Sequence, residues 1–227
     1  MANWVYNDIS FPKKYKNLIV NENGNVDFNL IAPIPSKILE SRWANESKND
    51  LSCFIIVYMT NKFRKPITNK LIYEIYQFIN EHIPYAFWIE CSNVTPEQGI
   101  FLILAKLNQI YTEESYNNYD FYYRNGKELY ELCKKCGTYN SYNWMYMNWG
   151  CKANALETQL VAETRVSYIY RFKTPWNVPD EWLKKISKKG IVFKDEWEEE
   201  QGERGIISNT KNKGFVIKDL KPIKWGE

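Results

Sequence analysis

Trp144-Met-Tyr-Met-Asn-Trp-Gly-Cys-Lys-Ala-Asn-Ala155, together with the opening Met1-Ala-Asn-Trp-Val-Tyr-Asn7, is the part of the sequence that points most directly to the fold. Both segments place Trp beside Asn in an alternating run that is typical of a half-buried strand. The later segment breaks at Gly150, where a residue without a Cβ lets the chain turn at no steric cost. Strands are therefore expected near both ends of the chain.

Further strands are expected on both sides of these segments, wherever apolar residues alternate. Residues 4–11 place Val5, Ile9 and Phe11 on one face of a strand. Between Ser167 and Lys173, Tyr168, Tyr170 and Phe172 alternate with polar residues in the same way. The same reasoning predicts strands at 26–31, 143–149, 191–197 and 205–208.

The middle of the chain has the spacing of amphipathic helices. Apolar residues repeat at helical intervals over 51–63, although Phe54 to Tyr58 also suits a buried strand. A clearer helix runs from Thr68, its N-cap, to Glu81. Another helix is expected after Ser36, and the capping box at 95–98 begins one that continues over 100–110. Two more are expected over 127–136 before Gly137 and from Pro179 to Gly190.

Strands at both ends with helices between them predict an α+β fold, a ferredoxin-like antiparallel sheet with a helical insertion. We expect one domain over residues 1–227. Its ferredoxin-like core would take residues 1–35 and 138–227, and the insertion would occupy about 36–137.

Composition excludes several classes of protein. The net charge of +3 comes from 30 basic and 27 acidic residues. This balance indicates neither a nucleic acid nor a membrane as a partner. The apolar run 100–105 is far shorter than the roughly 20 residues that span a bilayer. The opening residues lack a secretion signal and the Cys count of five is odd, so a cytoplasmic protein with reduced thiols is expected.

Four blocks of sequence carry a resemblance to a known family. Asn3-Trp-Val-Tyr-Asn7 resembles the Asn-Trp-Cys-x-Asn start of the YubB-like, ferredoxin-fold proteins of plasmids and phages. Phe28-Asn-Leu-Ile-Ala-Pro-Ile-Pro35 resembles that family's Phe-x-x-Ile-x-Pro-x-Pro. The segment from Tyr142 to Ala155 resembles its Trp-Tyr-x-Trp-x-x-x-Asn-Trp-Gly-Thr-Lys signature, and Phe172-Lys-Thr-Pro-Trp-Asn-Val-Pro179 resembles its Phe-x-Thr-x-Trp-x-x-Pro.

The resemblance implies a ferredoxin-like fold and an origin on a mobile genetic element, but no established activity. This sequence departs from the pattern where Val5 replaces Cys, where Cys151 replaces Thr, and where no Trp follows Lys152. Phage proteins of this size are often counter-defence factors, which is an association rather than a physical argument.

Few residues suggest catalytic or metal chemistry. Cys133-x-x-Cys136 has a metal-like spacing, but structural zinc needs four ligands and both residues fall on the apolar stripe of the expected helix, so core packing is favoured. His82, the one histidine, sits at a helix end where a capping role is favoured over catalysis. No phosphate-binding loop, dinucleotide turn or zincin motif is present, so no cofactor is expected.

Three surface features remain as candidate binding sites. The acidic run from Asp195 to Glu203 is either a solvated hairpin or a surface that mimics phosphate toward a basic partner, through Glu196, Glu198, Glu199, Glu200 and Glu203. Lys184, Lys185, Lys188 and Lys189 form either a solvated helix face or a phosphate-binding patch. Aromatics that could stack bases on an exposed sheet, or else fill the core, are Trp4, Tyr6, Trp144, Tyr146, Trp149, Tyr168 and Tyr170.

The leading hypothesis is a non-enzymatic accessory protein that binds and inhibits a host protein or nucleoprotein, such as a CRISPR effector, through the acidic residues. The alternative is a nucleic-acid-binding module that uses the four lysines with the sheet aromatics. No membrane partner is expected, and the sequence leaves the oligomeric state open.

Overall fold

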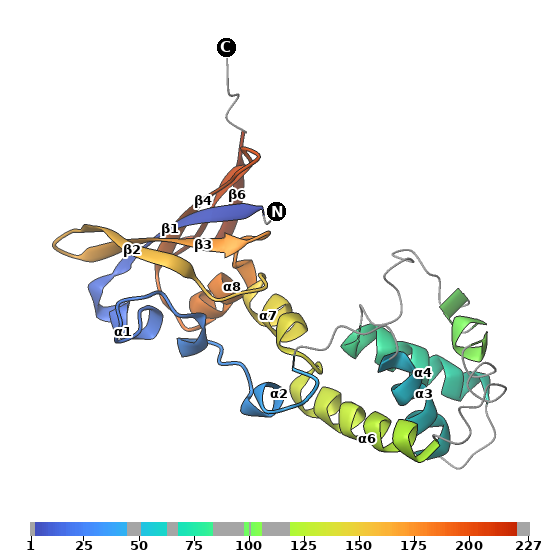
Figure 1. Ribbon diagram of the computed structural model, residues 1–227. Coiled ribbons are helices and arrows are strands. Elements are labelled where there is room, and N and C mark those ends of the chain that lie inside the picture. The colour runs from blue at the N-terminus through green and yellow to red at the C-terminus, as the bar shows by residue number, and fades with distance from the viewer. Residues whose placement is uncertain are drawn as a thin grey trace. The chain divides into compact units, whose positions relative to one another are not determined.

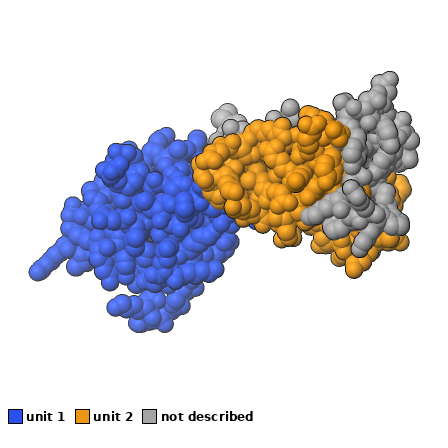
Figure 2. All heavy atoms as spheres, turned by 90° about the horizontal axis from the view of Figure 1, so that it is seen from below, with its two compact units in different colours: residues 1–34, 142–227 blue, residues 35–141 orange. Residues whose placement is uncertain are grey.

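The computed structural model describes residues 3–44, 51–62, 68–83, 98–99, 101–105 and 119–221 (Figure 1). Contacts between Cα atoms divide the chain into two compact units (Figure 2). The first consists of residues 1–34 and 142–227, and the second of residues 35–141. That the whole chain is one domain stays a prediction.

The first unit is built on a six-stranded antiparallel sheet in the order β2-β3-β1-β4-β5-β6. Its first four strands in that order, with helices between β1 and β2 and between β3 and β4, have the ferredoxin-like arrangement. The remaining two extend the sheet beyond β4. The strand bounds are β1 Trp4–Pro12, β2 Leu156–Glu163, β3 Ser167–Pro175, β4 Phe193–Glu199, β5 Arg204–Thr210 and β6 Gly214–Leu220. The predicted α+β class is confirmed.

Helices cover one face of this sheet. Figure 1 shows α1 (Lys16–Ile19), α7 (Ser141–Trp149) and α8 (Asp180–Lys188) on the same side of the strands. Helix α8 begins after Pro179 and ends before Gly190, as predicted, and it buries Trp182, Leu183 and Ile186. Alternate residues of β1 and β3 face this layer and form the core. The short helix α1 follows a 3-10 turn, η1 (Lys13–Tyr15).

An aromatic cluster sits at the centre of the first unit. Phe28, which is fully buried, lies with its ring centroid 4.4 Å from that of Trp182, 5.5 Å from that of Trp149 and 5.8 Å from that of Phe172. The indole Nε1 of Trp149 donates to the carbonyl of Ala32 at 2.9 Å, so its polar edge is satisfied inside the core. The cluster joins α7, α8 and β3 to the segment around Phe28.

Two predicted strands are wrong. Residues 143–149 lie in helix α7, where Asn148 Nδ2 donates to the carbonyl of Trp144 one turn earlier. Helix formation lets Trp144 and Trp149, five positions apart, both bury their rings. The expected strand at 26–31 instead contains a 3-10 turn, η2 (Phe28–Leu30), which Asp27 caps by accepting from Asn29 N. Only Val26 makes an isolated bridge, to Val20.

The second unit is helical in the part that the structure describes. Its helices are α2 (Ser36–Leu39), α3 (Leu51–Lys62), α4 (Asn69–His82) and α6 (Tyr119–Cys136). The segment 51–62 is therefore a helix and not a strand, and Thr68 caps α4 through Leu71 N, as predicted. The capping box at 95–97 and residues 100 and 106–110 lie outside the described residues, while 98–99 and 101–105 are helical.

Close packing of α3 and α6 makes the second unit compact. Phe54 of α3 lies 5.3 Å, between ring centroids, from Tyr122 of α6, and Tyr58 lies 5.2 Å from Tyr130. Gly126 allows this approach, because a Cβ there would overlap the carbonyl of Phe54. Every helix in the described ranges is too short or too polar to cross a membrane.

Candidate binding site

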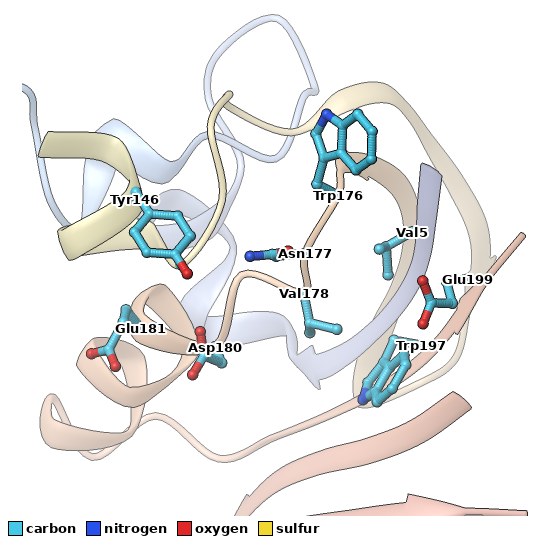
Figure 3. A pocket seen from close by; sticks show the side chains of 10 residues that line it. Val5, Tyr146, Trp176, Asn177, Val178, Asp180, Glu181, Trp197 and Glu199 are labelled. Carbon is cyan, nitrogen blue, oxygen red and sulfur yellow. The ribbon is translucent and has the colours of Figure 1, made fainter. Parts of the chain in front are cut away.

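A pocket of about 450 Å³ opens in the first unit where the start of α8 meets β1 and β4 (Figure 3). Ligand-binding pockets in proteins typically have volumes of about 300–1,000 Å³. Its lining combines three aromatic side chains with three carboxylates. The lining residues are Val5, Tyr146, Gly150, Trp176, Asn177, Val178, Asp180, Glu181, Trp197 and Glu199.

The turn between β3 and α8 forms one wall of the pocket. Trp176 there has φ +70°, a conformation that bulky residues rarely adopt, and its side chain is 53% exposed. Hydrogen bonds hold the turn in place: Trp176 N donates to the Asn3 carbonyl at 2.7 Å, and Thr174 Oγ1 donates to the Asn177 carbonyl at 2.8 Å. Strain of this kind persists where the surroundings impose it, and it is found preferentially at functional sites.

Asn3 also orients the carboxylate on the opposite wall. Its Nδ2 donates to Glu199 Oε2 at 2.6 Å, so the first residue of the described chain fixes both the Trp176 turn and Glu199. Glu199 has no lysine or arginine at ion-pair distance among the described residues. It shares a hydrogen bond with Glu203 but has no cation of the described residues beside it.

The carboxylates on the α8 side are compensated. Lys184 Nζ lies 2.9 Å from Asp180 Oδ2 and 2.7 Å from Glu181 Oε1. These two bonds raise the pKa of Lys184 and keep it charged. With three lining carboxylates and one neighbouring lysine, the pocket retains a negative charge.

Trp197 lines the pocket with its indole, whose N–H is enclosed by the protein. Its Nε1 is buried and has no hydrogen-bond partner. The indole lies against Gly205 on the neighbouring strand, where a Cβ would come within 2.7 Å of the ring. Because an unpaired buried N–H is costly, this group lowers the stability of the folded protein.

We expect Gly150→Ala to destabilise the protein by about 2–3 kcal/mol, measured by denaturant unfolding. Gly150 has φ +88°, and a Cβ there would overlap Asp180 Oδ1 at the pocket rim. Gly190→Ala is the matched control: it has φ +74° with open space around it, so it should lose only about 1–2 kcal/mol. Equal losses in the two variants would contradict the close approach at Gly150.

The predicted acidic residues do not form one surface. Because side chains alternate along β4, Glu196 and Glu198 point to the sheet face opposite the helices, whereas Glu199 points to the pocket. Glu200 and Glu203 lie at the turn toward β5, and Glu200 Oε2 accepts from Trp4 N at 3.2 Å. Asp195, at the start of the acidic run, is fully buried.

These glutamates lie close enough together to influence one another. A hydrogen bond from Glu203 to Glu199 and the charge of Glu199 raise the pKa of Glu203. Of the five predicted glutamates, only Glu196 has an ion pair among the residues the structure describes, with the neighbouring Lys194. Glu200 interacts electrostatically with Lys173, and Arg204 lies directly opposite Glu198 on β5. The hairpin formed by β4 and β5 therefore carries four glutamates without an ion pair, although basic side chains lie near two of them.

The four predicted lysines are not brought together as a free patch. Lys184 is engaged by Asp180 and Glu181, and Lys185 Nζ donates to the side-chain and backbone oxygens of Asn148 at 2.7 and 3.1 Å. Lys188 and Lys189 are exposed at the end of α8.

The aromatic residues are also dispersed. Trp144, Tyr146 and Trp149 lie on α7 and not on a strand, which corrects their predicted position. Tyr170 is buried in the core, Tyr168 is half-buried, and Trp4 and Tyr6 lie on the sheet face away from the helices. Of the seven, only Tyr146 lines the pocket.

Cys133 and His82 belong to the second unit. Cys133 is fully buried in α6, where burial raises the pKa of its thiol, and Cys136 is half-buried at the end of that helix. His82 Nδ1 donates to the carbonyl of Gly137 at 2.7 Å, which ties the end of α4 to the residue that follows α6. Among the described residues, no group of three potential ligands could hold a metal ion.

Sequence reasoning missed Trp176, Asn177, Asp180 and Glu181 as site residues. A signal was present, because three of the four sequence blocks that resemble the family contain residues that line the pocket. The block 3–7 contains Val5, the block 142–155 contains Tyr146 and Gly150, and the block 172–179 contains Trp176 to Val178. The fourth block supplies Phe28 to the core.

Comparison with known proteins gives one family match. Residues 157–220, which run from β2 to the end of β6, match the family model described as the ferredoxin-like domain in Api92-like protein. A crystal structure of the protein api92 from Yersinia pseudotuberculosis is similar to this chain at 8% sequence identity, with a TM-score of 0.42 and coverage of 99% of this chain and 100% of that one. No curated protein matches this chain.

Proposed function

We propose that this protein is a non-enzymatic binding protein that uses the β4–β5 hairpin to engage a basic surface of another protein. The observation that carries the proposal is the group of glutamates on this hairpin, most of which have no ion pair among the described residues. Acidic residues gathered on one element, in a chain of net charge +3, are typical of a surface that steers an oppositely charged partner.

The structure supports a partner that binds nucleic acid in a basic groove. Glu198 stands two residues from Glu196, which is paired with Lys194, on one face of β4. Their carboxylates therefore repeat along the strand as phosphates do along a nucleic-acid backbone. A standard interface would bury about 800 Å² on each protein. An accessory protein of a plasmid or phage would inhibit such a host factor, for example a CRISPR effector, by occupying the groove.

The described residues give the nucleic-acid-binding alternative less support. Lys184 and Lys185 are already held by side chains of this protein, and the aromatics do not share an open face. That alternative remains an outcome of the test.

Charge reversal at Glu196, Glu198 and Glu200 should weaken binding of a dye-labelled, lysine- and arginine-rich peptide at least tenfold, measured by fluorescence anisotropy. Each exposed charge pair contributes about 0.2–1 kcal/mol, and reversal also introduces repulsion. The affinity of the unmodified protein should fall as salt is raised from low to physiological strength.

The matched control reverses three exposed glutamates elsewhere, Glu22, Glu74 and Glu131, and alters net charge by the same amount. It should change the affinity less than twofold. If both triple variants weaken peptide binding equally, net charge alone explains the loss of affinity, and the proposal is overturned. Tighter binding of single- or double-stranded DNA than of the peptide would establish the alternative.

A further inference from the structure

We infer that the pocket lined by Trp176, Trp197 and Glu199 binds the side chain of an arginine from the protein partner. This inference rests on the proposed function, since it assigns one residue of the basic partner to one site. It adds the pocket, which lies on the other face of β4 from Glu196 and Glu198.

Charge selects a cation for this pocket. Asp180 and Glu181 share Lys184, whereas Glu199 has no basic partner among the described residues. Asn3 Nδ2 donates to one oxygen of Glu199, at 2.6 Å, and Glu203 shares a hydrogen bond with the same carboxylate. A carboxylate has about four acceptor sites, so acceptor capacity remains. An anion would be repelled by Glu199, and Lys184 is already held by Asp180 and Glu181.

The aromatic lining favours a guanidinium over an ammonium group. Trp176 and Trp197 both line the pocket, and Figure 3 shows Glu199 beside Trp197, both on β4, with the Trp176 indole at the opposite rim. A guanidinium is planar, stacks on indole faces and binds a carboxylate through two parallel hydrogen bonds. Lysine offers a compact, strongly hydrated charge that does neither.

The remaining polar groups suit the backbone of the same peptide. Figure 3 shows the Asn177 amide and the Tyr146 hydroxyl on the α8 side of the pocket, where they can bond to backbone groups on either side of the arginine. The pocket therefore offers partners for a whole arginine residue within a chain.

The strained turn at Trp176 holds its indole in the pocket wall before a ligand binds. With φ +70°, Trp176 displays an indole that is 53% exposed, although burying it in the core would release more free energy. The hydrogen bond from Trp176 N to the Asn3 carbonyl fixes this conformation before any ligand arrives. A fixed aromatic face loses little conformational entropy on binding.

The test uses the full chain and two capped peptides, Gly-Gly-Arg-Gly-Gly and its counterpart with neutral citrulline in place of arginine. Binding is followed through the indole N–H signals in NMR spectra, with those of Trp176 and Trp197 assigned from Trp→Phe variants. The arginine peptide should shift both signals and bind at least tenfold tighter than the citrulline peptide. Equal affinities, or shifts confined to other tryptophans, would overturn the inference.

Variants distinguish binding in the pocket from binding at Glu196, Glu198 and Glu200. Glu199→Gln and Trp176→Ala should each weaken the arginine peptide at least fivefold, whereas Glu198→Gln, one residue away on the opposite face of β4, should leave it unchanged. The Glu196, Glu198 and Glu200 charge reversal should still bind it. One outcome is that the affinity for the lysine- and arginine-rich peptide falls on reversal of those three glutamates and stays unchanged in Glu199→Gln and Trp176→Ala. In that case the pocket inference fails while the proposed function stands. If the arginine peptide binds the pocket, but reversal of Glu196, Glu198 and Glu200 leaves the affinity for the lysine- and arginine-rich peptide unchanged, the proposed function fails instead.

Discussion

Asp195→Asn is expected to stabilise the protein at neutral pH, by roughly 3 kcal/mol, and to remove most of the decline in stability between pH 5 and pH 7. Asp195 is 0% exposed and neither carboxyl oxygen has a hydrogen-bond partner. On its strand it faces Ile9 of β1 and Ile207 of β5, so it lies in an apolar layer. Such a site strongly disfavours the charged form of the group.

Burial, together with the charges of Asp8 and Glu196, raises the pKa of Asp195 from 3.8 to about 8. The folded protein therefore keeps this carboxyl protonated at neutral pH, whereas the unfolded chain releases the proton above about pH 4. Its contribution to stability is fully present below that pH, and it is lost as pH rises toward 8. The loss is about 1.4 kcal/mol for each pH unit within this window.

Urea unfolding of both proteins at pH 5, 6 and 7 measures this slope. The free energy of unfolding should fall with pH more steeply in the unmodified protein than in Asp195→Asn. Glu198→Gln, which removes a carboxyl from the same strand on its other face, is the control and should keep the original slope. Identical slopes in the unmodified protein and Asp195→Asn would show that Asp195 is not a protonated core residue.

Phe28→Ala should destabilise the first unit by about 3–5 kcal/mol, the usual loss when a buried phenylalanine leaves a cavity. Phe28 contacts Trp149, Phe172 and Trp182, so its removal loosens α7, β3 and α8 together. Chemical denaturation followed by circular dichroism measures the loss. Phe28→Leu retains most of the volume and should lose about 1–2 kcal/mol.

The same curves test whether the chain is one domain. A single transition that Phe28→Ala displaces as a whole is the result that the single-domain prediction requires. Two transitions, of which Phe28→Ala displaces one, would contradict that prediction. Leu39→Ala, at an exposed position of the second unit, should leave every transition within about 0.5 kcal/mol and serves as the control. A loss below 1 kcal/mol for Phe28→Ala would contradict the central role of this ring.

Much of the sheet could be predicted because its strands alternate. In β1, Val5, Ile9 and Phe11 face the core with Asn7 between them, and in β3 Tyr170 and Phe172 do the same. Helices with strong end signals were predictable for a similar reason: Thr68 caps α4, and α8 lies between Pro179 and Gly190. In each case local geometry and burial agree.

The errors arose where two periods fit the same residues. In α7, aromatic residues at every second position look like a strand, but Trp144 and Trp149 bury their rings from a helix. Strand β2 was missed because nearly all its residues are exposed and its pairing with β3 contains register shifts, so it has no apolar alternation. At 26–31, the cap formed by Asp27 decides the local structure.

The candidate site was only partly predictable. The acidic run was evident, yet strand alternation sends Asp195 into the core, Glu199 to the pocket and Glu196 to the other face, which a list of charges does not reveal. The pocket joins the first strand to residues more than 140 positions later, and only the tertiary structure brings Asn3 to Glu199. The blocks that contain its residues were visible, but not their convergence.

Affinity capture from a bacterial lysate, with and without nuclease, tests whether the β4–β5 hairpin binds a basic protein. The baits are the tagged protein, the Glu196, Glu198 and Glu200 reversal, and the Glu22, Glu74 and Glu131 reversal. The tagged protein should capture a stoichiometric protein with a basic surface, and this protein should survive nuclease. The Glu22, Glu74 and Glu131 reversal should retain it, and the Glu196, Glu198 and Glu200 reversal should lose it. Retention of that protein by the hairpin variant, or recovery of nucleic acid alone, would contradict the proposed function.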